Sequence, residues 1–87
     1  MASQLGRRGL ARLALRRPGL RGRLVTFDDP SGEFESLCAA YEEACCALEG
    51  WRQSSAEYAD LRVAEYQQLI ADLESDLMQS VTNKASR

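Results

Sequence analysis

The chain has 87 residues, a formal net charge of −2, 45% hydrophobic residues, three cysteines and no histidine. A chain of this length forms one small domain at most, and its hydrophobic content argues against disorder throughout. Without histidine, the chain lacks the commonest general base and the usual partner of a nucleophilic serine or cysteine. The composition therefore predicts a protein that is not an enzyme and that needs no cofactor.

Residues 1–24 form a strongly basic arm. The arm contains seven arginines and no acid, whereas residues 25–87 contain all thirteen acids and four basic residues. This composition is typical of a mitochondrial presequence, which would contact an import receptor, and Arg23 would suit a processing site just before Val25. A disordered basic tail has the same composition, and contact with nucleic acid or an anionic membrane is the third and weakest alternative. The arginines are Arg7, Arg8, Arg12, Arg16, Arg17, Arg21 and Arg23.

Residues 25–32 are a joint that leads into a first helix at about 31–49. Asp29 followed by Pro30 is typical of a helix N-cap and first helical position, and Ser31 is an alternative cap. Beyond the joint, large apolar residues recur at alternating intervals of three and four. This spacing predicts a narrow apolar stripe of the kind by which helices pair in coiled coils. The stripe consists of Phe34, Leu37, Tyr41, Ala44, Leu48 and Trp51.

Gly50 leaves two arrangements open. It is suited to end the first helix in a left-handed conformation, but a glycine is also tolerated inside one long helix at a cost of ~1 kcal/mol. The Ser-x-x-Glu pattern that begins at Ser54 is a capping box and favours a new helix. A helical hairpin is therefore the first expectation, and a continuous helix is the alternative.

The second helix, at about 55–82, carries its own apolar stripe, whose spacing from Leu69 onward is mostly four, slightly longer than a heptad step. Together with the first helix it makes an expected interaction module at 33–82, and 83–87 form a tail. The second stripe consists of Tyr58, Leu61, Tyr66, Leu69, Ile70, Leu73, Leu77 and Val81.

The three cysteines, Cys38, Cys45 and Cys46, lie in the first predicted helix. Their number and spacing do not match a structural zinc site, so no metal is expected. Cys38 and Cys45 fall beside the apolar stripe and are expected to fill the core, while Cys46 is expected to be exposed. An odd number of cysteines without a secretory signal predicts an intracellular protein with reduced thiols, in the cytoplasm or, as the close alternative, in mitochondria.

The acidic residues are expected to lie on the outer helix faces, with Glu42, Glu43 and Glu49 facing water. The second helix carries six acids against one arginine. A solvated face is the usual explanation, and pairing with a basic partner or with the arginine arm of the same chain is the alternative.

These patterns predict an all-α protein: a helical hairpin or a long helix that forms a coiled coil or helical bundle with a partner, preceded by a basic, disordered arm. The two stripes hold more apolar surface than one hairpin seam can cover, so they are expected to bind helical protein partners or further copies of the chain. No apolar run approaches the ~20 residues of a transmembrane helix. The expected function is that of an adaptor or small subunit of a helical complex, and the alternative is a mitochondrially imported assembly factor.

Overall fold

The computed structural model describes residues 4–26 and 31–85, and within these ranges every regular element is helical. The predicted all-α fold class is therefore confirmed. The helix cap that the sequence places at Asp29 and Pro30 lies outside the described residues. The elements are α1 (Gln4–Arg16), the 3-10 helix η1 (Pro18–Leu20), α2 (Arg21–Thr26), α3 (Glu33–Arg52) and α4 (Ala59–Ala85).

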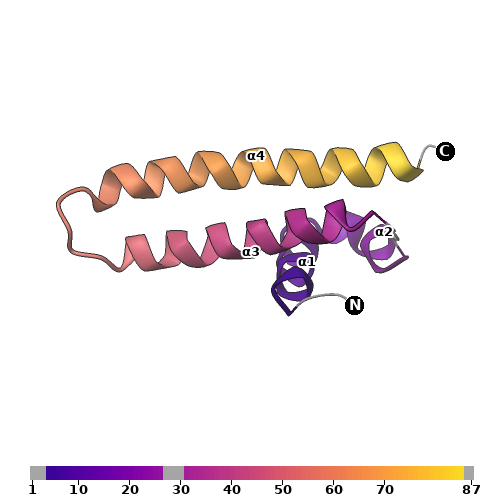
Figure 1. The fold of residues 1–87 in the computed structure, drawn as a ribbon, viewed down its shortest axis with the longest axis horizontal. Coiled ribbons are helices and arrows are strands. Elements are labelled where there is room, and N and C mark those ends of the chain that lie inside the picture. Colours follow the sequence, from indigo (N-terminus) through magenta and orange to yellow (C-terminus); the bar gives the residue numbers. More distant parts are fainter. Residues whose placement is uncertain (1–3, 27–30, 86–87) are drawn as a thin grey trace.

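The two long helices, α3 and α4, form an antiparallel hairpin (Figure 1). The hairpin, rather than the continuous helix, is thus the arrangement found. α3 passes through Gly50 without a break and ends at Arg52, where the N–H of Gln53 donates to the carbonyl oxygens of Glu49 and Gly50 at 3.3 and 3.2 Å. Gly50 therefore ends no helix, because it lacks the positive φ of the left-handed cap that the sequence suggested, and Gln53 is the C-cap.

The connection between α3 and α4 is longer than the sequence suggests. The expected capping box at Ser54 does not start α4, which begins at Ala59. Instead, the hydroxyl of Ser54 accepts a hydrogen bond from the N–H of Ala56 at 3.1 Å, a local turn that competes with helix formation. The difference moves Tyr58 out of the helix and onto the turn.

The basic arm is helical and packed, which differs from the expected disorder. α1 crosses the hairpin in the half remote from the turn (Figure 1), packing mainly on α3, and Arg16 at its end reaches Glu74 of α4. Gly6, Gly9 and Leu13 are its buried residues. A Cβ atom at Gly9 would overlap the carbonyl oxygen of Cys38, so only glycine lets the two backbones approach this closely. Gly6 and Gly9 therefore belong to the face of α1 that packs on the hairpin.

The core lies where α1, α3 and α4 meet. Tyr41, Leu13 and Leu77 are fully buried, and the molecule is elongated, with dimensions of 48 × 24 × 21 Å. Because α1 is much shorter than the hairpin, it covers only part of it. We call the covered part the proximal half, and the part from residue 50 to residue 72, around the turn, the tip.

Candidate protein interaction site

The structure divides the predicted interface residues between an internal core and an exposed surface. The residues buried in the core of the chain are Phe34, Tyr41, Ala44, Ile70, Leu77 and Val81. Those partly buried and packed against that core are Leu37, Leu48, Tyr66 and Leu73. Only Tyr58, Leu61 and Leu69 are exposed, and all three belong to the tip. The apolar stripes therefore serve mainly to hold the chain together.

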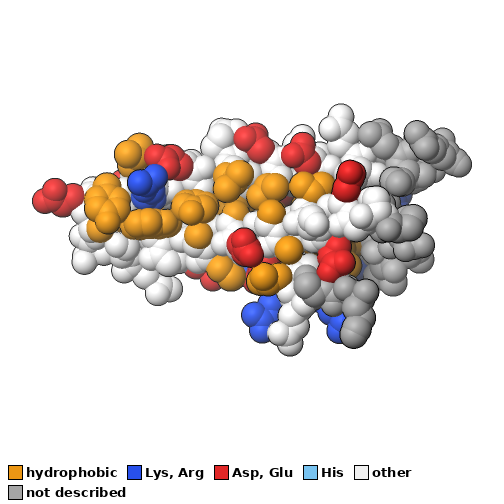
Figure 2. All heavy atoms as spheres, in the orientation of Figure 1, with side chains coloured by type: hydrophobic (Ala, Val, Ile, Leu, Met, Phe, Trp, Pro, Cys, Tyr) orange, Lys and Arg blue, Asp and Glu red, His pale blue; other side chains and the backbone are white. Residues whose placement is uncertain are grey.

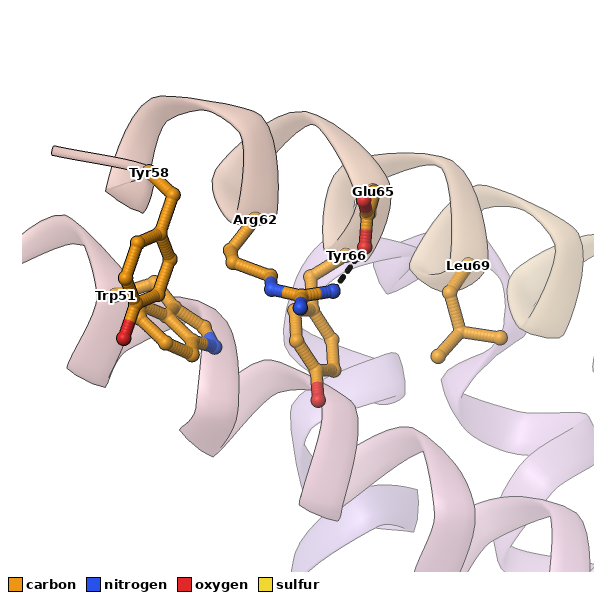
Figure 3. Close-up of a pocket in the computed structure, with 6 residues that line it drawn as sticks. All are labelled: Trp51, Tyr58, Arg62, Glu65, Tyr66 and Leu69. Carbon is orange, nitrogen blue, oxygen red and sulfur yellow. Dashed lines mark hydrogen bonds and ion pairs between the residues drawn. The ribbon is translucent and has the colours of Figure 1, made fainter.

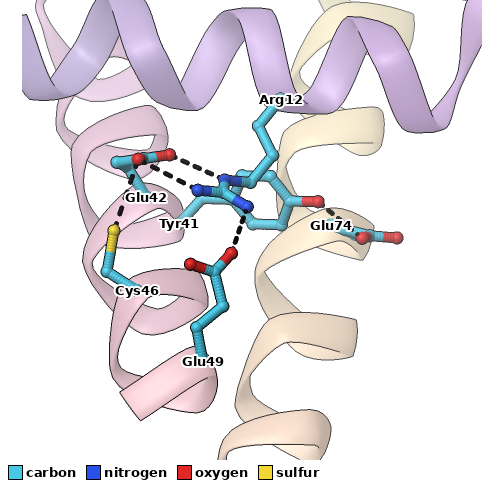
Figure 4. Close-up of polar contacts among 6 residues, drawn as sticks. All are labelled: Arg12, Tyr41, Glu42, Cys46, Glu49 and Glu74. Atoms are coloured by element: carbon cyan, nitrogen blue, oxygen red, sulfur yellow. Dashed lines mark hydrogen bonds and ion pairs between the residues drawn. The ribbon is translucent and has the colours of Figure 1, made fainter.

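The first charged cluster joins α1 to α3 through Arg12. Its guanidinium group donates to both carboxylate oxygens of Glu42, at 2.7 and 3.1 Å, and to Glu49 at 3.0 Å (Figure 4). Glu42 is only 5% exposed, so the expectation that it faces water is wrong. The hydrogen bond from Arg12 lowers the pKa of Glu42, and a further hydrogen bond from the thiol of Cys46 acts in the same direction. The carboxylate is thus held ionised inside the packed proximal half.

The second charged cluster centres on Glu74 of α4, which is also 5% exposed. The hydroxyl of Tyr41 donates to its carboxylate at 2.7 Å (Figure 4), Arg16 approaches it at 2.8 Å, and Arg17 at 3.5 Å. Burial, followed by this hydrogen bond, raises the pKa of Tyr41 well above its ordinary value. Among the described residues, no buried side-chain polar atom lacks a hydrogen-bond partner. Both clusters therefore stabilise the docked arm rather than offering a reactive group.

The cysteines follow the expectation. Cys38 and Cys45 are buried and Cys46 is exposed. Burial raises the pKa of Cys38 to about 11, and burial also raises the pKa of Cys45. These thiols are neutral core groups at ordinary pH. In the described ranges, no three metal-ligating side chains lie close enough together to hold an ion.

The tip carries a groove of about 570 Å³ between the end of α3 and the start of α4. Its aromatic part is an edge-to-face pair, Trp51 and Tyr58, whose ring centroids are 5.6 Å apart at an angle of 62°. An ion pair of 2.9 Å joins Arg62 and Glu65 along one side (Figure 3). We call this feature the tip groove, and it is lined by Trp51, Tyr58, Arg62, Glu65, Tyr66 and Leu69.

In the space-filling view, hydrophobic side chains form a nearly continuous band from the turn to the middle of the hairpin (Figure 2). The band is widest at the tip, where exposed fractions reach 57% for Tyr58 and 61% for Leu61. Trp and Tyr dominate the energetics of many protein interfaces. An arrangement of this kind can bind a protein helix by burying its apolar face.

Sequence reasoning identified the tip residues, and its alternative that acids of the second helix pair with the arginine arm is confirmed for Glu74. It did not predict that the arm forms a helix packed on the hairpin. The signal for docking is present: Gly6, Gly9 and Leu13 recur at intervals of three and four, which places them on one helix face. Arg12 and Arg16 flank that face, four residues apart, and could have been matched with carboxylates on the hairpin.

Within residues 4–26 and 31–85, no helix combines the length and apolar character that crossing a membrane requires. Comparison with protein-family models, with curated proteins and with solved structures finds no match to this chain.

Proposed function

We propose that this protein is a non-enzymatic helical interaction module, an adaptor or small subunit of a helical complex, whose tip groove binds an amphipathic helix of a partner. The observation that supports the proposal is the placement of exposed apolar side chains. Tyr58, Leu61 and Leu69 gather at the tip, where α1 does not cover the hairpin. An amphipathic helix laid into an apolar groove is a common mode of protein recognition.

The expected partner helix is basic. Residues 50–72 contain four acids and only two arginines, so the surroundings of the groove are negatively charged. The proximal half gives an example of the same preference, since it binds the arginine-rich, acid-free helix α1 through Glu42 and Glu49. Opposite charge at the edge of an apolar contact raises the association rate and orients the partner.

Trp51 allows a direct test, because it is the only tryptophan of the chain and lines the groove. A synthetic amphipathic helix with one lysine face and one leucine face should change the emission of Trp51 in a saturable manner. The same peptide with glutamate in place of lysine should bind at least about tenfold more weakly. If neither peptide gives saturable binding to the unmutated protein, the proposal is wrong.

A pair of variants separates the groove from the rest of α4. Leu69→Asp places a charge in the groove at an exposed position and should weaken peptide binding at least about tenfold. Gln79→Asp adds the same charge to an exposed position of α4 outside the groove and should leave the affinity unchanged. Leu48 and Leu73 are unsuitable for this purpose, because they pack against the core and their replacement would unfold the protein.

The mitochondrial alternative has a separate test. Removal of residues 1–24 would take away Arg12, Arg16 and Arg17, which neutralise buried carboxylates of the hairpin. This consideration favours an arm that stays with the module. A fluorescent reporter fused to residues 1–30 would show mitochondrial signal if the arm is a presequence, and diffuse signal if it is not.

A further inference from the structure

The outer surface of the arm has features that the packing of the core does not explain. Leu15 is the most exposed large hydrophobic side chain in the described ranges, with 77% of its surface open. It borders a second groove, which lies between α1 and α2. The floor of this groove is apolar, and two arginines belong to its lining. We call this feature the arm groove, and the residues of its lining that matter here are Arg7, Leu10, Ala14, Leu15, Arg21 and Leu24.

The arm and the tip carry opposite net charges, and the lining of the tip groove itself holds one arginine and one glutamate, which pair with each other. The segment from 4 to 26 has seven arginines and no acid, and Arg7, Arg8 and Arg21 are exposed. The tip has a net charge of −2 from its four acids and two arginines. Each groove therefore offers an apolar surface within a region whose net charge is opposite to that of the other region.

The two grooves cannot meet within one molecule. α1 is fixed on the proximal half by Gly9 and by the ion pairs of Arg12, whereas the tip groove lies at the turn (Figure 1). In Figure 2 the hydrophobic band lies toward the turn and has one basic side chain within it, while other basic side chains lie on the α1 side. A contact between them thus requires a second copy of the chain.

We propose that copies of this chain associate head to tail, with the arm groove of one copy seated on the tip groove of the next. This inference rests on the proposed function, because it names the partner of the tip groove. Leu15 of one copy packs against Tyr58 and Leu69 of the next, and Arg7 and Arg21 lie near its acidic residues. The contact is heterologous, so it extends into open chains unless the geometry closes a ring.

A symmetric dimer is disfavoured by the same charges. Two tips placed face to face would bring together two regions of net negative charge, and two arm grooves would bring together two arginine-rich surfaces. Only the head-to-tail contact pairs unlike charges. Association should therefore weaken when salt is raised from about 0.05 M to about 0.5 M.

Two single variants test the proposal. Leu15→Asp disables the arm groove and Leu69→Asp disables the tip groove, and both positions are exposed, so circular dichroism should show the helices of the unmutated chain. In sedimentation velocity, the unmutated chain should form species larger than 9.7 kDa that grow with concentration. Each variant alone should be monomeric. A mixture of the two should stop at a dimer, because one intact arm groove meets one intact tip groove.

Other outcomes overturn the proposal and separate it from the proposed function. A monomeric mixture, or undiminished association of Leu15→Asp, excludes the head-to-tail contact. If the tip groove nevertheless binds the basic peptide, the proposed function stands and only this inference falls. A monomeric unmutated chain that sediments with phosphatidylserine-containing vesicles, and loses this binding in Leu15→Asp, would assign the arm groove to a membrane surface instead.

Discussion

The proximal half and the tip are built from the same two helices, yet they differ in what covers them. In the proximal half, α1 supplies a third helix, so that Tyr41 and Leu77 are fully buried and the carboxylate of Glu42 is neutralised by arginine. At the tip, α3 and α4 meet without a third helix among the described residues, and Tyr58 and Leu61 stay more than half exposed. The difference teaches that the buried contacts are concentrated in the proximal half and that the tip, where we propose that a partner binds, keeps its apolar side chains exposed.

The strongest test of this division is Gly9→Ala. The added methyl group would overlap the carbonyl oxygen of Cys38, so α1 must move away from α3 and the free energy of unfolding should fall by about 3 kcal/mol. Gly50→Ala is the matched control, because Gly50 is helical and has open space around it. It should raise stability by about 0.5–1 kcal/mol, as measured by urea unfolding. Equal effects of the two changes would contradict the docking of α1.

The second-largest difference between the halves should lie in how much their ion pairs contribute to stability. Arg12→Met leaves the buried carboxylate of Glu42 without its partner and should cost about 2 kcal/mol in unfolding experiments. Arg62→Met removes an exposed pair with Glu65 and should cost less than about 0.5 kcal/mol. A cost for Arg62→Met that matches the cost for Arg12→Met would remove the distinction between the halves.

Acid should weaken the proximal half specifically. Arg12 lowers the pKa of Glu42 below the value of 4.5 expected for an unfolded chain. The contribution of this carboxylate is therefore complete above about pH 5 and is lost as the pH falls through the lowered pKa. Glu42→Gln should be less stable than the unmutated protein near neutral pH, by about 1–2 kcal/mol, and should approach it at about pH 2. Denaturant titrations at successive pH values measure this difference. Glu65→Gln, which removes an exposed ion pair at the tip, is the control and should cost less than about 0.5 kcal/mol near neutral pH.

The smallest difference concerns two tyrosine hydroxyl groups. Tyr41→Phe removes the buried hydrogen bond to Glu74 and should lower stability by about 1 kcal/mol. Tyr58→Phe removes an exposed hydroxyl group and should change stability by less than about 0.3 kcal/mol. Thermal unfolding resolves the contrast, and a cost at Tyr58 that equals the cost at Tyr41 would contradict it.

The sequence predicted the two helices of the hairpin better than it predicted that α1 packs against them. The stripe from Phe34 to Trp51 indicated α3 because apolar spacing is a local property of the chain. The docking of α1 depends on residues more than 25 positions apart, such as Gly9 and Cys38. The spacing of residues in α1 indicates that one of its faces packs, but it does not indicate which segment of the chain that face contacts. The composition of the arm resembles that of a disordered basic tail, because glycine and arginine are abundant in the arm and in such tails.

The candidate site was predicted only in part, again because spacing along the chain does not reveal contacts between distant segments. Tyr58, Leu61 and Leu69 appeared in the predicted interface, together with Leu77 and others that the core takes up. A stripe shows which face of a helix is apolar, but not how much of it a distant segment covers. The length of α1 relative to the hairpin decides this, and it leaves the tip open.

The link between Arg17 and Glu74 has a consequence for how the chain folds. These residues are 57 positions apart, so their contact closes most of the chain into a single loop. The entropy lost in closing so long a loop must be offset by many contacts that form together. The hairpin can assemble early from neighbouring segments, but the proximal half becomes complete only when both the arm and α4 are available, and a deletion at either place should unfold the same cooperative unit.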